Sequence, residues 1–217
     1  MSNNVIQPSF AAGEMSPTLN ARVDLAKYHV GAAKMRNFFV DYRGGASTRT
    51  GTKFVALALQ SYFFKDPTKT VWLIPFKFSV IQTYMLEFGD FYMRVFMDGA
   101  PVLEPAINIT GITQAGTGII SATSHGFSNN DTVFLASIQG MTELNQFTGV
   151  VANVTATSFS LRDPVTGMNI STIGFTAYTG GGTVSMVFTL TTPYAAADLP
   201  LVKFTQSADV MTLVHTS

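Results

Sequence analysis

The stretch QPSFAAGEMSPTLNARVDLAKYHVGAAKMRNFFVDYRGGASTRTGTKFV, residues 7–55, decides how the rest of the chain is interpreted. It holds 7 of the 13 basic residues of the chain but only 3 of its 13 acidic residues. Glycine and proline interrupt it repeatedly, and its strand patterning is weak, so it has little with which to form a core of its own. We therefore predict that residues 1–52 form an extended docking arm.

Composition points to a protein that assembles. Only 12% of the 217 residues are charged and the formal net charge is zero, whereas ordinary soluble domains have about 25% charged residues. A surface with so few charges protects a monomer poorly against association, so we expect neighbouring subunits to cover much of it. The alternative is a compact β domain rich in threonine and serine. The N-terminus lacks the features of a secretory signal, and no apolar run approaches the ~18 residues of a membrane-spanning helix.

The arm is expected to contain one short helix. Ser16 and Pro17 suit its first positions, and Gly31 suits its end. The helical spacing is carried by Leu19, Val23, Ala26 and Val30. Residues 34–40 continue as a second short helix or a strand, and residues 42–45 must turn.

Residues 53–104 are predicted to form a meander of antiparallel strands. The strand-like runs are Lys53–Leu59, Thr70–Phe78, Thr83–Phe88 and Phe91–Met97. Gly89 and Asp90 separate the last two runs, which indicates a hairpin. The strands are apolar on both faces, so the sheet requires a partner layer. Glu87 and Asp90 bracket the hairpin and are interpreted as solvated carboxylates.

Residues 107–186 are predicted to form a separate small β module. They are rich in threonine, serine, glycine and asparagine, and turn signals recur at about the 8–12-residue spacing of small sandwiches or barrels. Strands are expected near 107–113, 118–123, 131–137, 146–154, 158–162 and 182–190, with a turn at Gly180–Gly182. After the module we expect a short helix at Pro193–Leu199, then strands at Leu201–Thr205 and Val210–His215.

These elements predict a mainly β chain of three parts. The docking arm, residues 1–52, carries a short helix. A discontinuous platform domain, residues 53–106 plus 187–217, is an antiparallel sheet that resembles the start of a propeller. The inserted module, residues 107–186, is a small β barrel or sandwich.

No catalytic or metal-binding pattern is present. The sequence has no cysteine, which excludes disulfides, thiolate metal sites and cysteine nucleophiles. The three histidines, His29, His125 and His215, lie in separate segments, and His125 is interpreted as a turn-capping or exposed residue. Neither a metalloprotease helix motif nor a nucleophile elbow occurs. We predict no enzyme, no cofactor and no metal.

The basic bias of the arm raises the possibility of nucleic-acid contact. Its cations are spread along the chain and interrupted by Asp24 and Asp41. Pairing with carboxylates of a neighbour, or simple solvation, explains them as well. Sequence-specific readout of DNA is therefore not expected, but non-specific contact with DNA passing through a channel is compatible with this charge.

A set of short motifs spans nearly the whole chain. They are Pro8-Ser9-Phe10, Gly13-Glu14, Ser16-Pro17, Arg22–Tyr28, Asn37-Phe38, Gly44-Gly45, Arg49 with Gly51, Leu73–Phe76, Tyr84–Gly89, Arg94–Phe96, Thr192–Tyr194 and Phe204–Met211. In these motifs the chain resembles the nozzle, or tail tubular B-type, proteins of short-tailed, podovirus-like bacteriophages. Members of that family usually have proline where this chain has Thr50. They also run on for hundreds of residues, so the resemblance implies a fragment, a truncated gene or a shortened variant.

The inserted module carries a second resemblance. His125-Gly126-Phe127, Asp131-Thr132-Val133, Gly140-Met141, Leu144-Asn145 and Gly180–Thr183 make residues 109–186 similar to a small β module named after the FCCH domain of ubiquitin-activating enzymes. Ubiquitin chemistry does not follow from this likeness, because the chain has no cysteine.

The first resemblance implies a structural virion protein of a phage tail, made in the cytoplasm of the bacterial host. It would form a homo-oligomeric ring, expected to be sixfold, below the portal and adaptor proteins, and would line part of the DNA exit channel near the tail fibre proteins. The residues expected to mediate assembly are Arg22, Asp24, Lys27, Tyr28, Asn37, Phe38, Gly44, Gly45 and Arg49. The alternative is a virion module that binds a host-surface glycan or a tail fibre.

Overall fold

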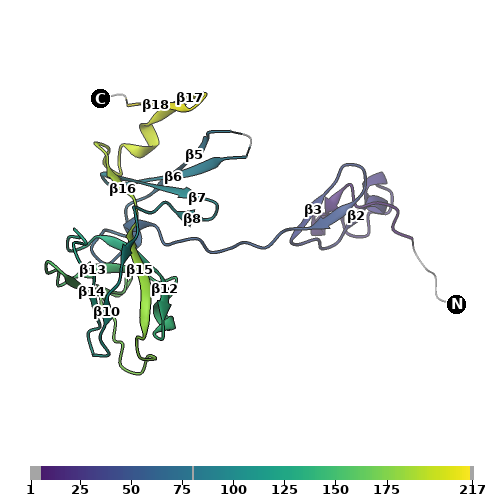
Figure 1. Cartoon of the computed structure of the whole chain (residues 1–217). Helices are drawn as coiled ribbons and strands as arrows, with labels where there is room; N and C mark the ends of the chain where they lie inside the picture. Colours follow the sequence, from purple (N-terminus) through teal and green to yellow (C-terminus); the bar gives the residue numbers. More distant parts are fainter. Residues whose placement is uncertain (1–5, 80, 216–217) are drawn as a thin grey trace. The chain divides into compact units, whose positions relative to one another are not determined.

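The computed structural model describes residues 6–79 and 81–215 and consists of short strands joined by turns and 3₁₀ helices (Figure 1). The predicted mainly β class is confirmed. Contacts divide the chain into two units, Met1–Phe54 and Val55–Ser217.

The first unit is held together mainly by its backbone. Its elements are β1 (Gly13–Glu14), η1 (Pro17–Leu19), η2 (Ala26–Val30), β2 (Gly31–Ala32), β3 (Phe38–Val40) and β4 (Ala46–Thr48). Strand β1 pairs with β2 in parallel, and β3 pairs with β4 as an antiparallel hairpin. The predicted turn at residues 42–45 closes that hairpin: Asp41 N donates to Gly45 O, and Gly44 N donates to Asp41 O, both at 2.9 Å.

The single helix predicted for the arm is wrong. The chain forms the two 3₁₀ turns η1 and η2 instead, and Ala21 between them has a positive φ of 67°. The predicted start and end of the helical segment are confirmed, because η1 begins at Pro17 after Ser16 and η2 ends before Gly31. Short helices depend on tertiary packing of their apolar face, and none of Leu19, Val23 and Val30 is buried here. The apolar spacing alone therefore does not make a helix.

The second unit contains the platform sheet, with strand order β16-β7-β6-β5. Its strands are β5 (Trp72–Lys77), β6 (Thr83–Gly89), β7 (Tyr92–Met97), β8 (Ala100–Pro101) and β16 (Thr189–Thr191). The predicted hairpin is confirmed, with Asp90 and Phe91 between β6 and β7. The strand predicted at Lys53–Leu59 is wrong: residues 53–58 pair with no strand, and the run ends in the 3₁₀ helix η3 (Leu59–Ser61).

One edge of the platform sheet is a strand that the module interrupts. Strand β8 pairs with the C-terminal end of β7, with Phe96 opposite Pro101, and Val102 N then donates to Val95 O at 2.8 Å. The next residue of β7, Arg94, is paired with Thr189 of β16. Positions 100–102 and 189–191 therefore continue one another along β7 in an unbroken register, although the chain between them leaves the sheet.

The module is a seven-stranded sheet with the order β10-β11-β14-β13-β12-β15-β9. Its elements are β9 (Ile107–Asn108), β10 (Gly111–Ile112), β11 (Ile119–Ser121), β12 (Thr132–Gln139), η4 (Thr142–Leu144), β13 (Thr148–Ala152), β14 (Ser158–Arg162) and β15 (Gly180–Met186). Within the described residues this sheet does not close, so it is not a barrel. Its core is fully buried at Ala122, Val133, Leu135, Met141 and Phe159.

The turn predicted at Gly180–Gly182 is wrong, because these glycines open β15 and pair with the end of β12. All three have positive φ, and a Cβ on Gly182 would lie 2.8 Å from Ile138 Cγ1. Glycine at position 182 thus permits a close approach of β15 to Ile138 of β12 that a side chain would prevent.

After β16 the chain turns and forms η5 (Leu199–Leu201) and a hairpin of β17 (Lys203–Ser207) and β18 (Val210–Val214), drawn in yellow in Figure 1. The two predicted strands are confirmed, but the helix at Pro193–Leu199 is wrong. Asp198 Oδ2 accepts from Ala195 N at 3.0 Å and holds a turn there. Pro200 lies inside η5 rather than ending a helix.

Candidate docking surfaces

The arm lacks a core of its own. Among described residues 6–54, glycine 31 is the only buried one. Phe39 is 60% exposed and Tyr42 is 81% exposed. All three residues of β3 are exposed, so apolar side chains are in contact with solvent on both faces of the hairpin. An isolated two-stranded hairpin is marginally stable in water, so the hairpin has little within the described arm to stabilise it.

Five of the nine predicted assembly residues belong to the β3–β4 hairpin or to its base: Asn37, Phe38, Gly44, Gly45 and Arg49. Arg49 N donates to Asn37 O at 2.7 Å, which closes the base. Gly44 has a φ of 105°, and a Cβ there would lie 2.6 Å from Ser9 Oγ. These positions thus shape one projecting element.

The other four predicted residues lie in the segment before β2. The Arg22 guanidinium donates to both carboxylate oxygens of Asp24, at 2.8 and 2.6 Å. This hydrogen bonding lowers the pKa of the Asp24 carboxyl, and the pair is fully exposed. Lys27 and Tyr28 lie in η2. The role of all nine in docking stays a prediction.

The platform sheet has two apolar faces, as the sequence pattern predicts. Paired residues share a face, so Ile74, Leu86 and Val95 lie together, as do Phe88, Met93 and Leu190. We call this the hairpin face, because Met211 and Leu213 of β18 pack against it. Leu73, Pro75, Met85 and Phe96 lie on the opposite side, which we call the open face.

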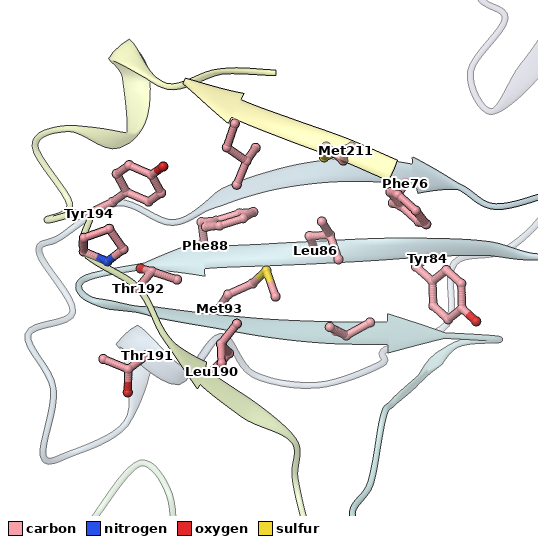
Figure 2. Close-up of a pocket in the computed structure, with 13 residues that line it drawn as sticks. Phe76, Tyr84, Leu86, Phe88, Met93, Leu190, Thr191, Thr192, Tyr194 and Met211 are labelled. Carbon is pink, nitrogen blue, oxygen red and sulfur yellow. The ribbon is translucent and has the colours of Figure 1, made fainter. Parts of the chain in front are cut away.

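A groove of about 550 Å³ runs between the hairpin face and the C-terminal hairpin. Figure 2 shows its side chains coming from both layers, with Leu86 and Phe88 on the sheet and Met211 on β18. Tyr194 stands at one end, where its ring lies 6.1 Å from that of His215. The lining holds no carboxylate or cation, so it suits apolar side chains rather than a charged ligand.

A second groove, of about 650 Å³, lies on the open face. Its walls include exposed Leu73, Met85 and Met97, and Asp98 lies among the lining residues. Val55, Ala56 and Ala58, which follow the arm in sequence, also line it. This groove is therefore a broad apolar surface beside the segment that leads from the arm.

A buried polar network, which sequence reasoning missed, fixes that segment to the sheet. Glu87 is 3% exposed, and its Oε1 accepts from Tyr92 Oη at 2.7 Å and from Leu59 N at 3.0 Å. Tyr92 Oη also accepts from Gln60 N at 3.1 Å. Glu87 is thus a structural anchor, and the prediction that it is solvated is wrong. One signal could have indicated its burial: Glu87 lies on a strand that is apolar on both faces, and the hairpin places it opposite Arg94.

Arg94 completes this buried polar group. It is 1% exposed, and its guanidinium carbon lies 5.2 Å from the centre of the Tyr62 ring. Burial raises the pKa of the Tyr92 hydroxyl far above its ordinary value, and the charge of Glu87 adds to this effect as the second cause. Asp90, by contrast, is held at the surface by Lys69 at 2.6 Å.

The raised pKa of Tyr92 predicts a loss of stability in alkali. In the unfolded chain the phenol ionises near pH 10, whereas the folded protein keeps it protonated. Its contribution is therefore complete below pH 10 and declines as the pH rises above it, by up to about 1.4 kcal/mol per pH unit. Urea unfolding of the chain and of Tyr92→Phe, between pH 8 and pH 11, should show a shallower decline for the variant. A Tyr42→Phe control should keep the original slope; equal slopes in all three would contradict the assignment.

His125 lies in a buried turn of the module. His125 Nδ1 accepts from Phe127 N at 3.0 Å, which confirms turn capping, but the side chain is buried at 5% exposure. Within residues 6–79 and 81–215, no cluster of three or more histidine, aspartate or glutamate side chains could hold a metal ion. No helix in the described part of the chain is long and apolar enough to cross a membrane.

Comparison with known families bears on the module alone. Residues 118–187 match the sequence profile described as the ubiquitin-activating enzyme E1 FCCH domain. The module resembles an FCCH domain. The match begins next to β11 and ends directly after β15, so it covers strands β11 to β15 of the module and leaves out β9 and β10. No curated protein matches the chain.

Proposed function

We propose that the chain is a structural assembly protein, the platform part of a nozzle-like ring in a phage tail. The observation that carries this proposal is that one chain has both an arm without a core and a sheet with apolar grooves on both faces. The arm exposes apolar side chains that need a surface to cover them, and the grooves of the sheet need apolar side chains to fill them. Large exposed apolar surfaces in a chain with few charges mark protein–protein contact.

The specific place in the virion comes from sequence resemblance. The motifs of the arm and of β5 to β7 resemble those of nozzle proteins, which supports a ring below the portal and adaptor. Sixfold symmetry, neighbouring tail fibre proteins and non-specific contact with passing DNA belong to the same proposal. The exposed cations of the arm are compatible with such contact.

A depression of the module lined by Ile112, Gly118 and Thr172 leaves only about 10 Å³, roughly the least space that holds one water molecule. A sugar ring does not fit in this depression. Assembly therefore remains the function best supported by the geometry.

The mass of the chain in solution tests the proposal. Sedimentation equilibrium or native mass spectrometry over a wide concentration range is expected to show a defined oligomer of the 23.4 kDa chain. Averaged particle images would then give the number of subunits and show whether they form a ring. A chain that remains monomeric at the highest concentration would contradict assembly through its own surfaces.

A further inference from the structure

The arm and the rest of the chain have opposite net charges. Residues 1–54 contain seven basic and three acidic residues, a net charge of +4, while residues 55–217 contain six basic and ten acidic residues, a net charge of −4. Opposite charges favour contact between an arm and a second unit, and equal charges disfavour contact between two arms. The charge distribution therefore indicates what the arm binds.

The β3–β4 hairpin is the part of the arm best suited to enter a groove. Phe38 and Val40 lie on one side of β3 and Phe39 on the other, all exposed. Exposed arginines flank the hairpin at positions 36, 43 and 49. It thus offers apolar side chains surrounded by positive charge.

The open-face groove has the matching character. Its volume of about 650 Å³ exceeds the 550 Å³ of the groove on the hairpin face, and the β17–β18 hairpin packs against the other face. Leu73 is 55% exposed and Met85 is 38% exposed, so a large apolar surface remains in contact with solvent. Asp98 lies at its edge, where it can meet an arginine.

Ring assembly explains why the occupant is another copy. A ring of more than two subunits uses two different surfaces, so each copy must carry one surface and its complement. Residues 50–54, between the base of the hairpin and the residues that line the groove, contain no helix, strand or turn, and five extended residues span at most about 18 Å.

We infer that the β3–β4 hairpin of one copy docks in the open-face groove of the platform sheet in a second copy. This inference rests on the proposed function and specifies the contact on which assembly depends. Phe38 or Phe39 fills the groove beside Met85, and an arginine of the hairpin pairs with Asp98.

Because the chain has no cysteine, site-directed cross-linking can test this contact cleanly. Ser47 is exposed on the hairpin, and Thr83 is exposed among the groove residues. Copies carrying Ser47→Cys and isotope-labelled copies carrying Thr83→Cys are mixed and treated with a short bismaleimide. The expected product joins one labelled and one unlabelled chain through these two positions, as read by mass spectrometry. Ser171→Cys, on an exposed loop of the module, replaces Thr83→Cys in the control and should give little product.

A charge reversal provides the second readout. Asp98→Lys, combined with Thr83→Cys, is expected to lower the cross-linking yield about two- to fivefold, in the range of one exposed ion pair. An oligomer of full mass without the cross-link, or with equal yield in the control, would overturn the hairpin contact but leave assembly intact. A chain that stays monomeric would overturn both. The two proposals can therefore fail separately.

Discussion

Chains carrying Phe38→Asp and Phe39→Asp together are expected to remain monomeric under conditions in which the unaltered chain assembles. Both side chains are largely exposed in the isolated arm, at 47% and 60%, so the substitutions remove little packing within one copy. One of the two rings fills the groove, so the double replacement costs at least about 1.5 kcal/mol and weakens the contact more than tenfold. Sedimentation velocity at matched concentration measures the effect.

A matched control uses exposed apolar residues that the proposal does not involve. Val165 and Met168, in a loop of the module, are 56% and 72% exposed. Val165→Asp with Met168→Asp introduces the same charge and should leave the oligomer unchanged. Assembly by the Phe38/Phe39 variant, or its loss in both variants, would show that the hairpin has no special role.

Phe159→Ala is expected to destabilise the module by about 3–5 kcal/mol, as is typical for removing a buried aromatic ring. The Phe159 side chain is fully buried and meets the rings of His125 and Phe127 edge-on, at 5.3 and 5.4 Å between centres. Hydrogen exchange of peptides from residues 118–187 should accelerate strongly, while peptides from β5 and β6 should change little. Ile173→Ala, at a side chain that is 69% exposed, should have an effect within about 0.5 kcal/mol.

The same variant separates the two functional hypotheses. If assembly does not need the module, the Phe159→Ala chain should still assemble but lose any binding that depends on the module. Loss of assembly together with loss of the module fold would instead give the module a structural role. The mass of the variant oligomer distinguishes these outcomes.

Strands β5, β6 and β7 of the platform were accessible from sequence because their evidence is local, but the strand predicted at Lys53–Leu59 was not formed. Alternation along Phe91–Met97, with Gly89 and Asp90 before it, predicts the hairpin, whose loop lies one residue later, at Asp90 and Phe91. The module was accessible in outline, because its turns recur at short intervals and its motifs resemble a known domain. The strand predicted near 107–113 is instead β9 and β10, and the one near 182–190 is divided between β15 of the module and β16 of the platform. In both cases, residues close together in the chain determine the structure.

Features that depend on distant partners were not accessible. Glu87 was interpreted as solvated, but its carboxylate anchors the backbone of Leu59, which is remote in sequence. The apolar spacing from Leu19 to Val30 predicts a helix only if a core lies beside it, and the described arm provides none. The candidate docking residues could be named from sequence motifs, whereas the two apolar grooves depend on strands far apart in the chain and could not.

The interrupted edge strand has a consequence for how such a chain can evolve. Val102 and Thr189 occupy successive places along β7, so joining them directly would preserve which side chains point to each face. Gain, loss or exchange of the intervening domain would leave each side chain of the edge strand on its present face of the sheet. The cost would fall mainly on the small cluster of Leu59, Tyr62, Tyr92 and Val150 that platform and module share. A different module could therefore be carried at this point without changing which side chains of the platform sheet lie on each face.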